Sequence, residues 1–133
     1  MSKTVTPYSL SKDGSLKVGP HFRAREFRCK DGSDPIFISE DLVSVLESIR
    51  SHFGKAVVIN SAYRTPSYNQ KVGGVATSQH LYGLAADIVV TGIAPATVYA
   101  YADTLLANRG GVGKYKTFTH VDVREKKSRW DYT

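Results

Sequence analysis

Two histidines and one aspartate are the residues of this sequence whose types and spacing could bind a metal ion. His80 and Asp87 lie seven residues apart in S-Q-H-L-Y-G-L-A-A-D, and His120 follows in F-T-H-V-D-V. Two imidazoles and one carboxylate are a sufficient protein ligand set for catalytic zinc, which leaves a fourth position to water. A His and an Asp at this spacing also occur by chance, so the surrounding sequence has to support the interpretation.

The context of Asp87 favours a bound cation. Gly83 interrupts the chain after His80, and Asp87 opens the apolar run 88–90, which predicts a loop, a turn and then a buried strand. An unpaired carboxylate at the start of a buried strand is costly, so Asp87 requires a positively charged partner. A metal ion and an arginine both satisfy this requirement.

Residues 118–123 are predicted to form a strand that carries His120. Because side chains alternate along a strand, Phe118, His120 and Asp122 are expected on one face. His120 and Asp122 would then project together into whatever lies on that face. A purely structural His–Asp pair is the alternative to a metal site at this position.

Local patterns predict the elements that position these residues. A helix over residues 40–53 is indicated by Ser39 as N-cap, acidic residues in the first turn, one apolar face and Gly54 as the stop. A buried strand at 56–60 leads into a loop with Arg64, which is either a surface group or a fixed positive charge for substrate. Further expectations are a short helix at 67–72, a helix from Pro95, a strand or turn at 110–115, and Trp130 at the core edge.

Length and composition are those of an ordinary globular protein. With 133 residues we expect one domain over 1–133, in which residues 1–20 are an N-terminal arm and Phe22 and Phe27 tuck against the body. No apolar run reaches transmembrane length and the start lacks a signal-peptide core, so we expect synthesis in the cytoplasm without a signal peptide. The single Cys29 excludes an internal disulfide and a thiolate zinc cluster.

The net charge of +6 favours polyanionic surroundings, such as nucleic acid or the anionic polymers of a cell wall. Nucleic acid is disfavoured as the main ligand, because the basic residues are scattered and no recognised nucleic-acid motif accompanies them. The one dense basic cluster, at residues 124–129, is explained equally well as a solvated tail.

Three motifs, in order along the chain, resemble the M15 group of zinc peptidases. They are S-A-Y-R-T-P-x-x-N at 61–69, G-G-V-A-x-S-x-H-x-x-G-x-A-x-D at 73–87 and G-V-G-x-Y-x-x-F-x-H-V-D-V-R at 111–124. This group comprises D-alanyl-D-alanine carboxypeptidases and dipeptidases and phage L-alanyl-D-glutamate endolysins. The resemblance runs from about His21 to Trp130. It implies an α+β fold, in which a small antiparallel sheet carries a zinc site on one face and helices pack on the other.

The resemblance also implies roles for individual residues. His80, Asp87 and His120 match the ligands of one zinc ion per chain, and Arg64 matches the arginine that holds or polarises substrate. The implied substrates are peptidoglycan stem peptides, whose amide bonds are hydrolysed by metal-activated water. Motif positions that shape the substrate-binding cleft are occupied by Ser61, Asn69 and Ser78.

One position departs from the family pattern. Many members place a general-base Asp or Glu three residues before the last zinc-binding His, and this chain has Thr117 there. A threonine is not a base near neutral pH. Asp122 is the substitute candidate for the catalytic base, although it could equally orient the ring of His120.

Three functions therefore stay open. The first is a peptidoglycan-cleaving endolysin of a phage or prophage, which we expect to be a monomer that acts at the cell wall after release, without membrane insertion. The second is a D,D-carboxypeptidase or dipeptidase of cell-wall precursors. The third is a non-catalytic zinc-bearing module that binds the wall.

Overall fold

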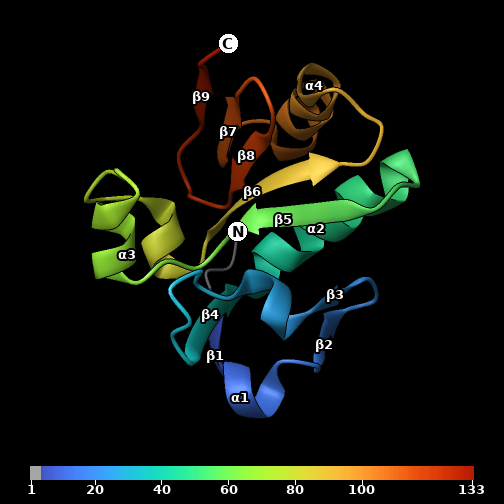
Figure 1. The fold of residues 1–133 in the computed structure, drawn as a ribbon. Helices are drawn as coiled ribbons and strands as arrows, with labels where there is room; N and C mark the ends of the chain where they lie inside the picture. The colour runs from blue at the N-terminus through green and yellow to red at the C-terminus, as the bar shows by residue number, and fades with distance from the viewer. Residues whose placement is uncertain (1–3) are drawn as a thin grey trace.

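A five-stranded sheet is the central element of the fold (Figure 1). The structure is a computed structural model, and it describes residues 4–133. The strand order is β5-β6-β8-β7-β9, with antiparallel neighbours except for the parallel pair of β7 and β9. The strands are β5 (Val57–Ser61), β6 (Ala85–Val90), β7 (Gly111–Lys114), β8 (Thr119–Asp122) and β9 (Ser128–Asp131).

Two helices, α2 (Glu40–Phe53) and α4 (Pro95–Leu106), pack against one face of this sheet. The apolar side chains on that face are fully or almost fully buried, and they include Ile88, Val90, Val112 and Val121. Alternation along the strands sends Asp87 and His120 to the opposite face. The expected α+β architecture, with helices on one face and the candidate metal site on the other, is therefore confirmed. The parallel strand β9 is an addition to the antiparallel sheet that the sequence led us to expect.

Helix α2 forms where the local sequence predicts it. The Ser39 hydroxyl accepts a hydrogen bond from the Leu42 amide, and Glu40 and Asp41 lie in the first turn. The helix ends at Gly54, whose φ of 63° is a left-handed conformation that glycine adopts without a side-chain clash. The apolar face of α2, which includes Leu42, Leu46 and Ile49, lies in the core.

The N-terminal region has more regular structure than an extended arm. Strand β1 (Val5–Ser9) pairs antiparallel with β4 (Pro35–Ser39), and β2 (Lys17–Gly19) pairs with β3 (Phe22–Arg23). A short helix α1 (Leu10–Asp13) and a 3₁₀ turn η1 (Ala24–Phe27) connect them. Phe22 and Phe27 are each 1% exposed and meet edge to face, so the prediction that they pack against the body is confirmed. Residues 1–3 of the predicted arm lie outside the described residues.

Two short helical segments lie beside the free face of the sheet. Helix α3 (Pro66–Lys71) follows β5, with Thr65 as its N-cap, and the 3₁₀ turn η2 (Gln79–Tyr82) precedes β6. Both segments fall within the region that the sequence assigns to loops and one short helix. No helix within residues 4–133 is long and apolar enough to cross a membrane.

Candidate metal centre

A row of register partners crosses the sheet and carries the candidate site. Ser61 on β5 pairs with Asp87 on β6, which pairs with His120 on β8. His120 pairs in turn with Gly113 on β7, and Gly113 pairs with Trp130 on β9. Paired residues project to the same face of a sheet, so five positions that are distant in sequence converge on one surface.

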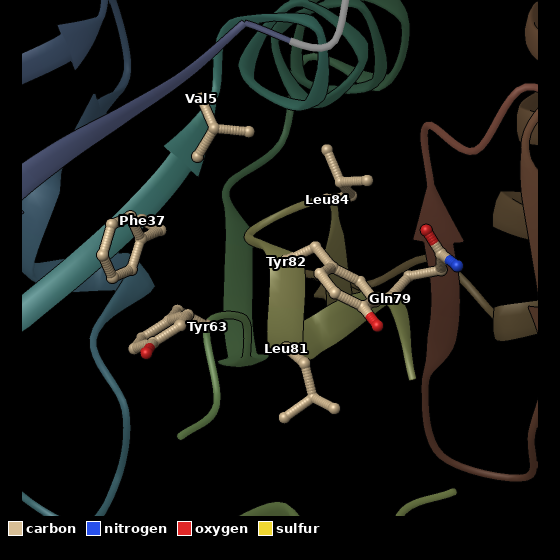
Figure 2. A pocket seen from close by; sticks show the side chains of 7 residues that line it. All are labelled: Val5, Phe37, Tyr63, Gln79, Leu81, Tyr82 and Leu84. Atoms are coloured by element: carbon tan, nitrogen blue, oxygen red, sulfur yellow. The ribbon is translucent and has the colours of Figure 1, made fainter. Parts of the chain in front are cut away.

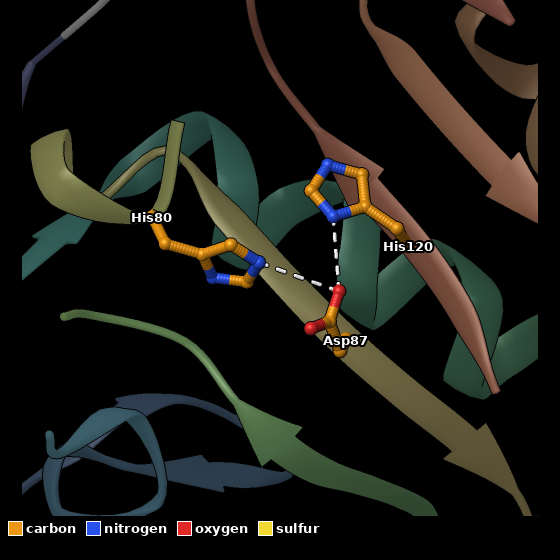
Figure 3. Close-up of side chains that lie close together, drawn as sticks. All are labelled: His80, Asp87 and His120. Carbon is orange, nitrogen blue, oxygen red and sulfur yellow. Dashed lines mark hydrogen bonds and ion pairs between the residues drawn. The ribbon is translucent and has the colours of Figure 1, made fainter. Parts of the chain in front are cut away.

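His80 reaches this row from the 3₁₀ turn η2. The Ser78 hydroxyl accepts from the His80 amide as N-cap, and Gly83 ends the turn with a φ of 72°. The Nδ1 of His80 lies 2.7 Å from the carbonyl oxygen of Ala62, which can only accept, so this nitrogen carries a proton. The Nε2 of His80 faces Asp87 at 3.3 Å from Oδ1 (Figure 3).

His120 presents its other nitrogen to the same oxygen. Its Nδ1 lies 2.9 Å from Asp87 Oδ1, and its Nε2 lies 2.8 Å from Asp122 Oδ2. Each imidazole therefore has one nitrogen bonded to an outer oxygen and one directed at Asp87 (Figure 3). This is the arrangement in which proteins hold histidine ligands of zinc, because the outer oxygen fixes the ring and its tautomer.

The donor set fits a zinc ion in both geometry and chemistry. One ligand atom from each of His80, Asp87 and His120 can be chosen so that all lie within 4.8 Å of one another, and all three residues are buried. Burial raises the pKa of the Asp87 carboxyl. Hydrogen bonds from His120 and His80 lower this pKa by more than burial raises it, so the pKa lies well below its ordinary value. A carboxylate that stays ionised between two imidazoles is a ready ligand for a divalent cation.

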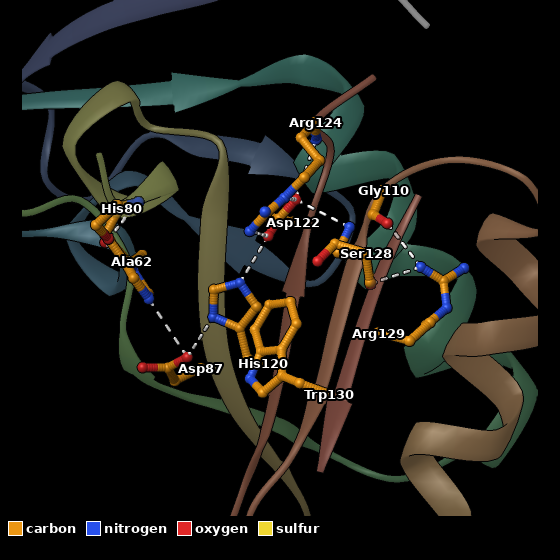
Figure 4. A network of polar contacts seen from close by, with 12 residues as sticks. Ala62, His80, Asp87, Gly110, His120, Asp122, Arg124, Ser128, Arg129 and Trp130 are labelled. Carbon is orange, nitrogen blue, oxygen red and sulfur yellow. Dashed lines mark hydrogen bonds and ion pairs between the residues drawn. The ribbon is translucent and has the colours of Figure 1, made fainter. Parts of the chain in front are cut away.

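Asp122 lies behind His120 rather than in open space (Figure 4). It is 0% exposed, and its Oδ1 accepts from the Gly111 amide and from the Arg124 side chain. Its Oδ2 accepts from Arg124 Nη2 at 2.6 Å and from the His120 ring. The prediction that His120 and Asp122 share a strand face is confirmed. Of the two roles that the sequence leaves open for Asp122, this geometry favours orienting the ring over accepting a proton from substrate.

Arg64 lies at the other side of the site, where three neighbours hold its guanidinium. Its Nε donates to Ser61 Oγ at 3.1 Å, its Nη1 to Asn69 Oδ1 at 3.1 Å, and its Nη2 to Asp87 Oδ2 at 3.4 Å. The side chain is 15% exposed. Asp87 thus has both of the partners that the sequence suggested, an arginine and a metal-binding arrangement of histidines.

Ser61, Asn69 and Ser78, which the resemblance assigns to the cleft, make hydrogen bonds that hold other residues of the site. Ser61 and Asn69 position Arg64, and Asn69 is itself fixed because its Nδ2 donates to the Val75 carbonyl at 2.9 Å. Ser78 is the N-cap of the turn that carries His80. These contacts favour a positioning function for each of the three residues.

The site opens into a cleft with a cavity volume of about 670 Å³. One wall is aromatic and is formed by Tyr115, Phe118, Trp130 and Tyr132, and we call it the aromatic wall. Another side is formed by the loop at 72–79. Among the described residues that line the cleft, Asp87 is the one carboxylate, whereas Arg64, Arg124 and Arg129 are cationic. Arg124 is paired with Asp122 and Arg129 with Asp103, whereas Arg64 lies beside Asp87 at the longer distance of 3.4 Å.

Two of these wall residues were missed by the sequence analysis. Trp130 lines the cleft beside His120, with ring centroids 5.0 Å apart, instead of closing the edge of the core. Tyr115 had only the family motif as a signal, because its position follows from the pairing of β7 with β8. Thr117, at the position of the general base in many relatives, is exposed and outside the cleft lining.

The remaining histidines lie away from the cleft. His21 bonds to Glu47 at 2.6 Å, and His52 stacks on Tyr101 with centroids 3.7 Å apart. A second cavity of about 600 Å³ has an apolar lining that includes Phe37, Tyr63 and Tyr82, and it shares Gln79 with the cleft (Figure 2).

Two imidazoles and a carboxylate on the free face of an α+β sheet, with an arginine beside them, form a ligand set of the kind that holds zinc in metal-dependent enzymes. The family model described as Peptidase M15 matches residues 20–122, which is more than half of the chain. The protein belongs to the Peptidase M15 family. Peptidases of this family depend on zinc and act on peptidoglycan-related substrates. A comparison with curated proteins gave no match.

Proposed function

We propose that this protein is a zinc peptidase that hydrolyses an amide bond in peptidoglycan stem peptides, as a phage or prophage endolysin. The observation that carries the proposal is the convergence of His80, Asp87 and His120 at the base of an open cleft. When bound by these residues, zinc would polarise a carbonyl and lower the pKa of a water molecule. A site of the same composition without a cleft would support only a structural metal.

The protein's own residues would supply positioning and charge. Arg64 is fixed by Ser61, Asn69 and Asp87, and the remaining N–H groups of its guanidinium can bind a substrate carboxylate or an amide carbonyl beside the metal ligands. Asp122 holds the His120 ring through Nε2 and keeps Nδ1 directed at the metal position. Arg64 in the cleft lining would attract a carboxylate of the stem peptides.

We further propose that the protein acts as a monomer at the cell wall after its release from the cell in which it is made. Its net charge of +6 would prolong its stay on anionic wall polymers. This attraction would weaken as salt is added, because exposed charges are screened over about 8 Å at physiological ionic strength.

The decisive experiment is digestion of purified peptidoglycan by zinc-loaded protein, with mass analysis of the released ends. We expect new amino and carboxyl ends within the stem peptide, and none after chelation or in His80→Ala. Release of terminal D-alanine from a soluble pentapeptide, with intact wall left uncut, would instead indicate a carboxypeptidase. Binding to the wall without new ends would indicate a non-catalytic module, a function favoured because Asp87 is the one carboxylate among the cleft-lining residues that the structure describes.

Arg64→Ala tests the proposed substrate contact. We expect kcat/KM to fall about 100-fold or more, since a charge-assisted contact at the reacting group is lost. Lys71→Ala is the matched control, because it removes an exposed cation from the nearby helix α3. Equal activity of the two variants would exclude Arg64 from the mechanism.

A further inference from the structure

Tyr115 is a polar side chain in the cleft to which neither the metal site nor the arginines assign a role. Its ring stacks on Phe118 with centroids 4.3 Å apart and meets Tyr132 edge to face at 5.4 Å. These contacts fix the ring within the aromatic wall. The phenol is therefore held in one place within the cleft, as a catalytic group has to be.

The hydroxyl of Tyr115 is poised to donate its proton. The Trp130 indole Nε1 lies 3.0 Å from the Tyr115 oxygen, and an indole nitrogen can only donate. The phenol oxygen is thus the acceptor in that bond, and its own O–H is free for another acceptor. Within residues 4–133 the hydroxyl has no other hydrogen bond. This donor on the wall of the cleft is available to an oxygen of a bound ligand.

The Trp130 indole places Tyr115 in the same part of the cleft as His120, because its ring centroid lies 5.0 Å from that of His120 and its Nε1 lies 3.0 Å from the Tyr115 oxygen. Burial raises the pKa of the phenol, and the charge of Asp87 raises it as well, whereas Trp130 and Arg64 lower it. The group therefore keeps its proton at neutral pH. Tyr115 lines the same cleft as Asp87, Arg64 and His120.

The arrangement depends on a glycine in the middle strand. Gly113 is the register partner of both His120 and Trp130, and a Cβ at this position would collide with the Trp130 indole. The missing side chain lets the indole lie across β7, where its Nε1 reaches Tyr115. Gly113 thus gives the Trp130 indole its position, and the indole in turn holds the phenol oxygen of Tyr115 through a hydrogen bond.

We propose that Tyr115 donates a hydrogen bond to the carbonyl oxygen of the scissile amide as that oxygen gains negative charge, and is thus a further catalytic residue. This role rests on the proposed amide hydrolysis. A fixed donor directed at a developing oxyanion lowers the barrier because the interaction is stronger in the transition state than in the bound substrate. Trp130 strengthens the donor, since a hydrogen bond accepted by the phenol oxygen polarises its O–H.

The test compares Tyr115→Phe with wild type on a soluble stem peptide, with both proteins loaded with zinc. Loss of one oxyanion donor lowers kcat by about 100-fold to 1000-fold, and we expect that loss with little change in KM. Zinc content and the far-ultraviolet spectrum should match wild type. Tyr99→Phe is the matched control, because it removes a phenol hydroxyl from α4 on the opposite face of the sheet, and its kcat should be unchanged.

The outcomes separate this role from the proposed function. Wild type that cleaves while Tyr115→Phe cleaves equally fast would overturn only the role of Tyr115. A raised KM with unchanged kcat would also overturn it, since the contact would then serve binding alone. Wild type that releases no ends would overturn the hydrolysis and this role together. If Tyr115→Phe does not fold, Trp130→Phe provides the second variant: it keeps the phenol without its orienting donor, and kcat should fall about 10-fold.

Discussion

His120 shows at the scale of single residues how the site is ordered. The ring is held between two carboxylates, with Asp87 on Nδ1 and Asp122 on Nε2. Burial lowers the pKa of His120. The hydrogen bonds to Asp122 and Asp87 raise this pKa by more than burial lowers it, so the pKa lies above its ordinary value. A cation at the position of the Nδ1 proton is therefore favoured electrostatically, and a metal ion can take that place.

Removal of the carboxylate behind His120 should weaken metal binding. In Asp122→Asn we expect zinc affinity to fall about 10-fold to 100-fold, because partners of this kind orient the ligand and raise its basicity. Competition with a coloured chelator measures the affinity. Asp103→Asn is the control, since Asp103 pairs with Arg129 at 2.6 Å from helix α4. Equal zinc affinity in the two variants would show that Asp122 does not act through His120.

Asp31 links the N-terminal region to the loop of Arg64. Its carboxylate accepts from the Ser33 amide at 2.9 Å and from the Thr65 hydroxyl at 2.8 Å. The contacts with Ser33, and then that with Thr65, hold the pKa of Asp31 below its ordinary value of 3.8. A depressed carboxyl pKa contributes stability that is fully present above 3.8 and is lost as pH falls through the folded-state pKa.

This linkage predicts a pH-dependent effect of Asp31→Asn. The variant should melt at a lower temperature than wild type at pH 7, and the difference should shrink as pH is lowered below the ordinary pKa of 3.8. Thermal unfolding followed by circular dichroism across this range measures the difference. A difference that stays constant with pH would mean that the charge of Asp31 does not stabilise the fold.

At the scale of elements, α2 supports the sheet from behind while strands present the site. Its N-cap Ser39 is 0% exposed, and its hydroxyl accepts from the Leu42 amide at 3.2 Å. In Ser39→Ala that amide would lose its partner in a buried place. We expect the free energy of unfolding to fall by about 1 kcal/mol, the usual cost of losing an N-cap side chain.

Urea unfolding of Ser39→Ala beside Ser44→Ala measures this cost. Ser44 is exposed in the same helix, and alanine has the higher helix propensity, so Ser44→Ala should leave stability unchanged or slightly raise it. Similar losses in both variants would assign the effect to helix propensity rather than to the cap.

Strand β7 contributes to the site through the side chains it lacks. Gly111 and Gly113 point to the free face, where a Cβ at Gly111 would collide with the Asp122 carboxylate and one at Gly113 with Trp130. The Asp122 carboxylate and the Trp130 indole therefore occupy the space that side chains at Gly111 and Gly113 would fill. The G-V-G sequence is explained by this close approach.

At the scale of the whole molecule, the core does not depend on the metal. Its buried apolar side chains come from the helices, the sheet and the N-terminal region, and none of them is a candidate ligand. The metal-free protein should therefore unfold cooperatively. Zinc at 100 times its dissociation constant should add about 2.7 kcal/mol to the free energy of unfolding, because it binds only the folded state.

Calorimetry with and without chelator measures this stabilisation. The melting temperature should rise with zinc concentration in wild type and stay constant in His80→Asn, which removes one ligand. A metal-free protein without a cooperative transition would contradict the prediction and make the metal part of the core.

The sequence by itself determined the residue types of the site and the elements with local signals. Helix α2 is encoded by its N-cap, its periodicity and Gly54, and the strand of His120 by alternation, since these features act between residues close along the chain. Phe22 and Phe27 were recognisable as core because aromatic side chains in such a position bury large apolar areas.

Only the tertiary structure decided which distant residues meet. The pairing of β1 with β4, the parallel addition of β9 and the row from Ser61 to Trp130 depend on contacts between strands far apart in sequence. Those contacts brought Trp130 to the phenol of Tyr115. Local propensity carries no information on strand register, so the directions of these side chains were fixed by the packing of the whole sheet.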